Sequence, residues 1–481
     1  MKQLRTHGPR LRSGVSFLAI LTILLAAGEL AAQEPPPLPT PPDTAVVDTL
    51  RVELPVADSL ETGADSLARA DSTAAPPPEV LAPFAPRGEP GWQRGVWSWD
   101  REALSESAAV TLTDLLERIP GVTPIRAGFV GAAEAASAFG AGAGRIEVIL
   151  DGFALDPLEA GTYDFSRLEL NQLESVRVER RLGGLRIEIR TLSPSDPRPY
   201  TVVEAGTGDM KTNLFRGIFL TPRFLGGPLS LGVEHLDTQG NFRREPATAF
   251  TGWAKWGLVS GNTGLELEMR RGSIERLVGD SVRTGNRQDW ILRARSAPFE
   301  NVTAEGFIGF SANEDDLAGQ LVDDKGMQAG FRAGYHADRG WAHSTVRLRD
   351  NEFLPSAEVE VAAGIDLPGR VHLSGDLNVE SWKGEGATSF GVRAEVGPWF
   401  GVRPFAEASF GRRGVPYLRN AADRPVFTDQ TALRVGADAS FGGLHLGVAG
   451  VRLDADSLSA FGLPFDRVPF LYPGGVRDGL E

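Results

Sequence analysis

Residues 327–335 read Met-Gln-Ala-Gly-Phe-Arg-Ala-Gly-Tyr, in which apolar side chains occupy every second position. Side chains of a β-strand alternate between its two faces, so this stretch predicts one apolar and one polar face. The same period recurs in about fifteen segments from Tyr200 onward, including residues 357–365 and 433–441. Each segment has nearly the ~10 residues that a tilted membrane-spanning strand needs. Residues 197–481 are therefore predicted to form a β-barrel.

Alternation alone does not require a membrane, because soluble β-sandwiches and propellers also alternate. Three further features favour a membrane barrel: long segments, a heavily charged polar face, and aromatic residues at segment ends, as in an interfacial girdle. Those aromatic residues are Trp253, Trp290, Trp341, Trp382, Trp399 and Phe400. The predicted fold class is mainly β: a transmembrane antiparallel β-barrel preceded by a small α/β domain. A secreted soluble β protein is the least favoured alternative.

The N-terminus has the features of an export signal. Four basic residues up to Arg12 precede an apolar run at residues 15–28 and the pair Ala31-Ala32, which predicts a signal peptide over residues 1–32. An N-terminal anchor helix is the alternative, although the run is short for a membrane span. Residues 33–92 are rich in proline and poor in aromatic residues, which predicts a disordered periplasmic linker.

Charge and composition exclude several classes of function. The formal net charge of −14 without a Lys/Arg cluster argues against a nucleic-acid partner. The chain has no cysteine, which removes disulfides and thiolate metal sites. It also lacks the His-x-x-x-His, G-x-S-x-G and phosphate-loop motifs. We therefore expect no enzyme, and no catalytic, cofactor or metal site.

Residues 93–196 are predicted to form a compact α/β domain. Ser107 or Thr111 would cap a short helix that Pro120-Gly121 ends. Strands are predicted at residues 145–150, 175–178 and 185–190, and the last of these alternates apolar and charged residues. Residues 127–144, mostly glycine and alanine, show no assignable period.

Three motifs in this domain occur in a characteristic order. They are Ile119-Pro120-Gly121-Val122, then Asp151-Gly152 after a strand, then the segment from Leu173 to Val178 that contains Glu174, Val176 and Val178. Together they resemble the plug domain of TonB-dependent outer-membrane receptors. In that family a plug of this size sits inside a barrel of about 22 strands. The resemblance implies the fold, an outer-membrane location and energy-coupled transport.

The chain departs from the family pattern in three places. Phe129 to Gly144 does not show the Ile-Arg-Gly strand of the family, and Arg181 to Leu185 is short, so we expect an abbreviated plug. Pro464 to Gly479 is predicted to be a loop. The barrel is therefore expected to be incomplete at its C-terminal end, with a fragmentary sequence favoured over closure by a second chain.

The resemblance also implies partners. TonB would add a strand to a short extended motif near the mature N-terminus, and Asp43-Thr44-Ala45-Val46-Val47 resembles such a TonB box. A chance pair of valines is equally compatible with it, and Val52-Glu53-Leu54 is a rival site. The other implied partners are outer-membrane lipid, the barrel-assembly machinery and an unidentified solute.

The function that follows is uptake of a bulky, scarce solute by energy-coupled plug movement. A non-transporting barrel with a degenerate plug, serving in scaffolding or adhesion, is the first alternative, and a passive porin is the second. Lumen residues such as Arg332, Arg393 and Glu395 are candidates for contact with the plug or the solute. Solvated or mutually paired lumen charges are the favoured interpretation of these three residues.

Overall fold

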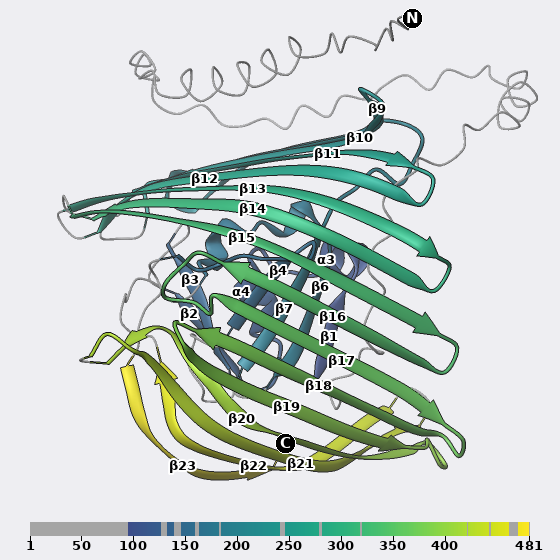
Figure 1. The fold of residues 1–481 in the computed structure, drawn as a ribbon. Coiled ribbons are helices and arrows are strands. Elements are labelled where there is room, and N and C mark those ends of the chain that lie inside the picture. Colours follow the sequence, from purple (N-terminus) through teal and green to yellow (C-terminus); the bar gives the residue numbers. More distant parts are fainter. Residues whose placement is uncertain are drawn as a thin grey trace, which may run out of the picture. The chain divides into compact units, whose positions relative to one another are not determined.

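The computed structural model describes residues 95–126, 132–138, 146–158, 163–181, 184–240, 246–278, 281–317, 320–420, 422–441, 444–460 and 470–480. The predicted signal peptide (residues 1–32) lies outside the described residues. So does the predicted linker (residues 33–92), which contains Asp43–Val47. The described residues form two parts: an inner domain, residues 95–192, and a wall sheet, residues 200–480 (Figure 1). Every helix among the described residues is too short or too polar to serve as a membrane span.

The inner domain contains a five-stranded mixed sheet in the order β1-β6-β7-β4-β5 and a separate hairpin, β2–β3. Its elements are β1 (Val96–Trp99), α3 (Arg101–Glu106), α4 (Leu112–Leu116), β2 (Val122–Arg126), β3 (Glu134–Ala138), β4 (Ile146–Leu150), β5 (Phe153–Ala154), η4 (Phe165–Arg167), η5 (Leu170–Gln172), β6 (Leu173–Arg181) and β7 (Gly184–Thr191). Strands β4 and β7 run parallel, whereas the other neighbours are antiparallel. The predicted α/β character of this segment is confirmed.

Helix α4 begins where the sequence predicts it. The Thr111 hydroxyl accepts from the backbone N–H of Asp114, and the Asp114 carboxylate accepts from the N–H groups of Val110 and Thr111. This capping box satisfies N–H groups that the first turn leaves without partners. The helix ends before Pro120, and Gly121 then adopts a φ of +84°, which glycine tolerates without a Cβ clash.

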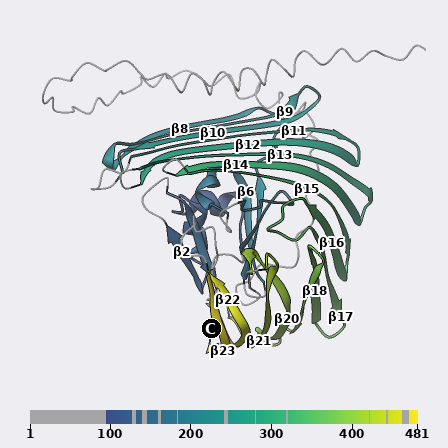
Figure 2. The same cartoon turned by 60° about the vertical axis from the view of Figure 1, so that its left-hand side comes forward.

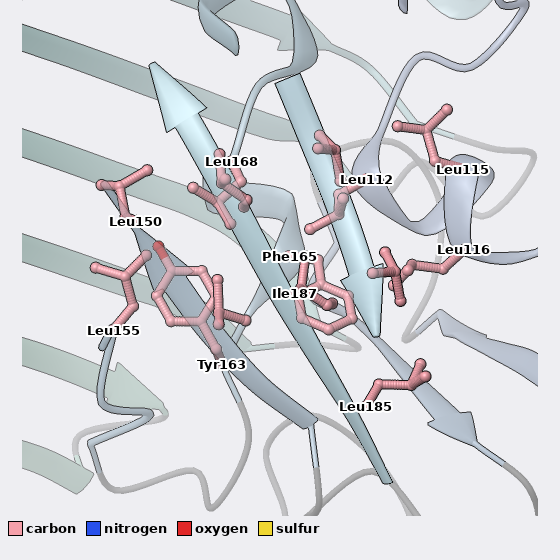
Figure 3. Close-up of a cluster of buried hydrophobic side chains, with 14 of the residues drawn as sticks. Leu112, Leu115, Leu116, Leu150, Leu155, Tyr163, Phe165, Leu168, Leu185 and Ile187 are labelled. Carbon is pink, nitrogen blue, oxygen red and sulfur yellow. The ribbon is translucent and has the colours of Figure 1, made fainter. Parts of the chain in front are cut away.

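The core of the inner domain lies between α4 and the sheet (Figure 3). Leu112, Leu115 and Leu116 have no exposed surface, and they gather with Phe165 and Ile187 in one hydrophobic cluster. Each such side chain stabilises the fold by about 1.5–3 kcal/mol relative to exposure. The inner domain therefore has an apolar core, to which Ile291 and Phe307 of the wall also belong.

Strand β3 shows that the prediction for the Gly/Ala-rich stretch was wrong. No strand was expected between Phe129 and Gly144, yet Glu134–Ala138 pairs with Val122–Arg126. Ala136 and Ala138 are fully buried, so the small side chains let the hairpin lie close to the core. Alanine and serine are too weakly hydrophobic to produce the alternation that marks a longer strand.

The wall sheet has sixteen described strands, each hydrogen-bonded to its neighbours in sequence. They are β8 (Tyr200–Gly208), β9 (Thr212–Phe224), β10 (Gly227–Thr238), β11 (Ala247–Ser260), β12 (Thr263–Val278), β13 (Ser281–Phe299), β14 (Val302–Leu317), β15 (Gln320–Ala337), β16 (Gly340–Arg349), β17 (Ala357–Leu367), β18 (Val371–Trp382), β19 (Glu385–Val396), β20 (Val402–Arg419), β21 (Pro425–Phe441), β22 (Leu444–Ala460) and β23 (Phe470–Leu480). A short 3-10 turn, η6 (Asp209–Lys211), joins β8 to β9. The sheet curves around the inner domain (Figure 2).

The wall sheet is apolar outside and polar inside. On β17 the side chains of Val359, Val361 and Ile365 are exposed, whereas Glu358 and Glu360 between them are buried. This is the reverse of a water-soluble sheet, which hides its apolar face. An outer face of this kind suits hydrocarbon, and the charged inner face suits a filled lumen. The predicted alternation and fold class are confirmed.

The predicted aromatic girdle is right at one turn and wrong at three tryptophans. Trp399 and Phe400 are exposed at the β19–β20 turn, but Trp253, Trp341 and Trp382 face inward. Each inward indole lies over a glycine whose missing side chain leaves it room. A Cβ on Gly232, Gly364 or Gly414 would come within 2.0, 2.6 and 2.3 Å of Trp253, Trp341 and Trp382, respectively. Position at the end of a segment does not reveal which face a residue occupies, because that depends on register.

Strand β23 corrects the prediction that Pro464 to Gly479 is a loop. Residues Phe470–Leu480 pair with β22, with Pro473 opposite Ser457. In the described sheet β23 is an edge strand, and an edge tolerates proline because one side of the strand needs no ladder hydrogen bond. Proline and glycine therefore gave a loop signal at a position where they are compatible with a strand.

The inner domain also has apolar contacts with the wall, of which Phe153 makes one. The ring of Phe153 meets Phe307 edge-on, with centroids 5.9 Å apart. It also lies against Gly309 of β14, where an added Cβ would come within 2.3 Å of the ring. Gly309 thus forms a shallow seat for Phe153 in the wall.

We predict that Gly309→Ala weakens the seating of the inner domain by about 1–3 kcal/mol, because the new methyl group collides with Phe153. Hydrogen exchange of the β4 and β7 amides measures the free energy of opening. Gly306→Ala is the matched control on the same strand, since its Cβ would meet only the Gly330 carbonyl at 4.0 Å. Equal effects of the two substitutions would contradict the assignment of this seat.

Candidate functional site

Eight charged side chains form an ion-pair network where the inner domain meets the wall. The inner domain contributes Glu147, Asp156, Arg181 and Arg186, and strands β16 and β17 contribute Arg347, Arg349, Glu358 and Glu360. Four guanidinium groups thus face four carboxylates, and Arg181 also lies 3.6 Å from Glu179 and 3.5 Å from Asp376. We call this set the plug–wall network.

Arg186 is at the centre of one half of the network. Its two terminal nitrogens donate to both carboxylate oxygens of Glu360, at 2.5 and 2.6 Å. Arg181 donates to the same carboxylate at 2.9 Å, and Glu147 lies 2.8 Å from Arg186. The bidentate geometry fixes both position and orientation of strand β7 against β17.

The other half of the network continues along β16. Arg347 donates to Glu147 of the inner domain at 3.0 Å and to Glu358 of the wall at 3.2 Å. Arg349 donates to Glu358 at 3.0 Å and to Asp156 of the inner domain at 3.2 Å. Each arginine therefore connects a wall carboxylate to an inner-domain carboxylate.

Burial determines the energetic character of this interface. Arg186 is 3% exposed and Glu360 is 2% exposed, so both ions have lost nearly all their hydration. Desolvation offsets much of the Coulomb attraction of a buried pair, so the intact pair contributes little net stability. Removal of one partner is costly, since it leaves an uncompensated charge. The contact is therefore specific in position without being a strong apolar adhesion.

A second contact forms at the Asp151-Gly152 turn. Both residues have positive φ values, +46° and +89°, as a two-residue hairpin turn between β4 and β5 requires. Wall side chains reach the turn: Arg293 donates to the Leu150 carbonyl at 3.1 Å and Arg332 to the Asp151 carbonyl at 3.2 Å. The turn predicted from the Asp-Gly pair is thus held by the wall.

The Asp151 carboxylate is held in its ionised form. Burial by itself would raise its pKa, but the positive charges of Lys255 and Arg293 and the hydrogen bonds from Thr191 lower the pKa to about 2. Lys255 lies 3.6 Å from the carboxylate and donates to the Thr191 hydroxyl at 2.6 Å. This turn therefore carries a negative charge at any physiological pH.

The other motif residues serve the core of the inner domain. Ile119, Val122, Val176 and Val178 are buried there, whereas Pro120, Gly121 and Glu174 are at its surface. Of the predicted set, the structure brings only Asp151 and Gly152 to the wall among described residues. The segment Asp43–Val47 lies outside the described residues.

Two cavities flank the plug–wall network. One, of about 640 Å³, is lined by Asp151, Glu174 and Lys255, and the other, of about 560 Å³, by Glu179 and Arg393. Arg186 lines both cavities, so the network stands between them. Charged side chains of both the inner domain and the wall sheet line both spaces.

One group of carboxylates has the spacing of a cation site. Asp151, Glu266 and Glu268 place ligand oxygens within 4.8 Å of one another. Arg293 donates to Glu266 at 2.9 Å and to Glu268 at 2.8 Å, and Lys255 lies beside Asp151. Fixed cations already balance these carboxylates, so the group does not fit a bound metal ion.

The fold is shared with solved structures of siderophore receptors and of a copper transporter. The siderophore receptor PirA of Acinetobacter baumannii has a TM-score of 0.61 at 10% identity, over 80% of this chain and 77% of that chain. A ferric enterobactin receptor of Pseudomonas aeruginosa, in complex with enterobactin, has 0.62 at 12%, over 80% and 78%. The copper transporter OprC has 0.63 at 14%, over 84% and 78%. No curated protein sequence matches the chain.

The sequence of the inner domain matches a known domain family. Residues 93–187 match the family model of the TonB-dependent receptor plug domain. The chain therefore contains a TonB-dependent receptor plug domain next to a sheet that shares the fold of the solved receptors. From here on the inner domain is called the plug and the wall sheet the barrel. The resemblance drawn from the three motifs is thereby confirmed.

The three candidate lumen residues have different surroundings. Arg332 reaches the plug at the Asp151 carbonyl and also donates to Glu305 at 2.6 Å. Arg393 donates to Glu395 at 2.8 Å, a pairing within one strand of the barrel. Sequence analysis did not single out Arg186 or Glu360. The signal for Glu360 was available, since Glu358 and Glu360 lie on the charged face of an alternating segment.

A single substitution in the plug–wall network should release the plug. We predict that Glu360→Gln lowers the free energy of plug opening by up to about 3–5 kcal/mol, because the buried Arg186 and Arg181 lose the carboxylate they share and Arg186 keeps only Glu147 as a partner. Hydrogen exchange of the β7 amides in the folded barrel measures this quantity.

Glu352→Gln is the control for that experiment. Glu352 pairs with Lys383 at the protein surface, and an exposed pair contributes less than about 1 kcal/mol. If Glu360→Gln changed β7 exchange no more than Glu352→Gln, the plug–wall network would not hold the plug.

Glu169 makes plug stability depend on pH. This carboxyl is buried beside Glu234 of the barrel, and burial first, then the charge of Glu234, raises its pKa to about 8. The folded state therefore holds a proton that the unfolded chain releases above its ordinary pKa of 4.5. The contribution of Glu169 to plug stability is greatest below that value and falls as pH rises from 4.5 to about 8.

We predict that Glu169→Gln removes this decline, because glutamine is neutral at both ends of the range. The thermal unfolding midpoint of the plug, measured at pH 5 and at pH 9, should differ less in the variant than in the parent chain. Glu102→Gln, on the exposed face of α3, should leave the difference unchanged. A pH difference that persists in Glu169→Gln would assign it to other groups.

Proposed function

We propose that the protein takes up a bulky, scarce solute across the outer membrane, driven by TonB-coupled movement of the plug. The observation that carries the proposal is that buried ion pairs, Arg186–Glu360 above all, fix the plug inside the barrel. Water can solvate these charges when the plug moves, so the interface opens at lower net cost than an apolar one of the same area. An energised pull can therefore separate surfaces that stay closed at rest.

The membrane location follows from the same architecture. The exposed apolar face of the barrel, with residues such as Val359 and Val361, suits contact with outer-membrane lipid. Insertion of such a barrel would use the barrel-assembly machinery, and the export signal at residues 1–32 would deliver the chain to it. We propose no enzymatic activity, no cofactor and no nucleic-acid partner.

Two classes of solute are candidates: a siderophore and a metal ion such as copper. The matched structures include receptors for siderophores and a copper transporter. The two cavities beside the plug–wall network have charged linings of both signs, which favour a polar solute over an apolar one. A passive porin is disfavoured, since the plug occupies the lumen (Figure 2).

The test is binding of a purified periplasmic TonB domain to the mature chain. We predict that the parent chain binds and that Val46→Pro abolishes binding, because proline removes a backbone donor needed for strand addition. Val52→Pro, in the rival segment, is the matched control and should bind like the parent chain.

Each other outcome has a definite meaning. Binding that survives Val46→Pro and is lost in Val52→Pro would place the TonB box at Val52-Glu53-Leu54. No binding by the parent chain would overturn energy-coupled uptake and leave a plugged barrel with a scaffolding or adhesion role.

A further inference from the structure

Two histidines of the barrel meet on its inner face. His336 on β15 and His343 on β16 flank the turn between these strands, and their Nε2 atoms lie 3.2 Å apart. The ring centroids are 5.3 Å apart. His343 is buried and His336 is half-buried, so neighbouring side chains restrict the motion of both rings.

The separation of the two nitrogens equals that of ligands on one metal ion. With metal–nitrogen bonds of 2.0–2.1 Å at a tetrahedral angle, two ligand nitrogens lie about 3.3 Å apart. In a metal-free protein the same pair shares one hydrogen bond, in which one ring donates to the other. A metal ion would replace that proton beside the line between the two nitrogens, with a rotation of the rings toward it.

The surroundings leave room for the rest of a coordination sphere. His343 lines the 640 Å³ cavity and His336 lines the 560 Å³ cavity, so the pair stands between the two spaces that flank the plug. The Trp341 ring packs edge-on against His343, with centroids 5.3 Å apart, which restricts the imidazole to this orientation. Water or a solute-borne ligand can therefore approach an ion held here.

We propose that His336 and His343 form a two-histidine site for a divalent transition-metal ion of the Cu²⁺, Ni²⁺ or Zn²⁺ type. Imidazole nitrogen suits these ions, whereas Mg²⁺ and Ca²⁺ take oxygen ligands. An ion that travels between plug and barrel wall meets this site at the boundary of the two cavities. The site goes beyond the proposed uptake function and does not depend on TonB coupling.

The test is titration of the purified, folded full chain in detergent with Cu²⁺ alone. Calorimetry gives the affinity, and the paramagnetic resonance spectrum of Cu²⁺ reports nitrogen ligands. We expect one site per chain, weakened by at least about tenfold in His336→Gln and in His343→Gln, since loss even of a partner that supports a ligand costs 10–100-fold. Glutamine keeps hydrogen-bonding capacity, and circular dichroism verifies that each variant is folded.

His372→Gln is the matched control. His372 also lines the 560 Å³ cavity, but its ring pairs with Asp366 at 2.8 Å and lies outside the proposed site. The control should bind Cu²⁺ like the parent chain. Binding equal to the parent in both His336→Gln and His343→Gln, or no binding by the parent, would overturn the site.

The metal-binding test and the TonB-binding test can fail independently of each other. A chain that binds Cu²⁺ through the two histidines but does not bind TonB keeps this site and overturns the proposed uptake. A chain that binds TonB but not Cu²⁺ overturns the site and keeps the uptake.

Discussion

The structure depends on one electrostatic constraint: a barrel with an apolar exterior has to carry its charged side chains inside. Those charges need partners, which come partly from neighbouring barrel strands, as for Arg393 and Glu395, and partly from the plug. Arg347 and Arg349 each connect a wall carboxylate to a plug carboxylate, and Glu360 receives Arg186 from the plug. Ion pairs thus position the plug, while its leucine core keeps it folded, and that core continues to Ile291 and Phe307 of the barrel.

Much of the fold could be predicted because its signals are local. Two-residue alternation gave the barrel, and the Thr111 cap with Pro120-Gly121 gave helix α4. The Asp151-Gly152 pair predicted a hairpin turn, because only residues that accept a positive φ fit at these two positions. Such features are written in a few consecutive residues, so tertiary structure is not needed to find them.

The rest could not be predicted because it depends on register and on distant neighbours. Trp253 faces inward since Gly232 on the next strand makes room for it, and no local pattern announces that pairing. Strand β23 contains a proline that only an edge position tolerates. Arg186 meets Glu360 across 174 residues of chain, so the central contact of the candidate site has no short sequence signature.

Strand β1 has a mechanical consequence for this arrangement. It is an edge strand of the plug sheet, held to β6 through four register pairs from Val96 to Trp99, and residues 33–92 directly precede it in the chain. If TonB pulls on those residues, as proposed above, β1 is the first strand that the pull reaches. Detachment of β1 would uncover the edge of β6, where Arg177 and Glu179 already border the 560 Å³ cavity. The proposed pull and this cavity would then meet at one edge of the plug sheet.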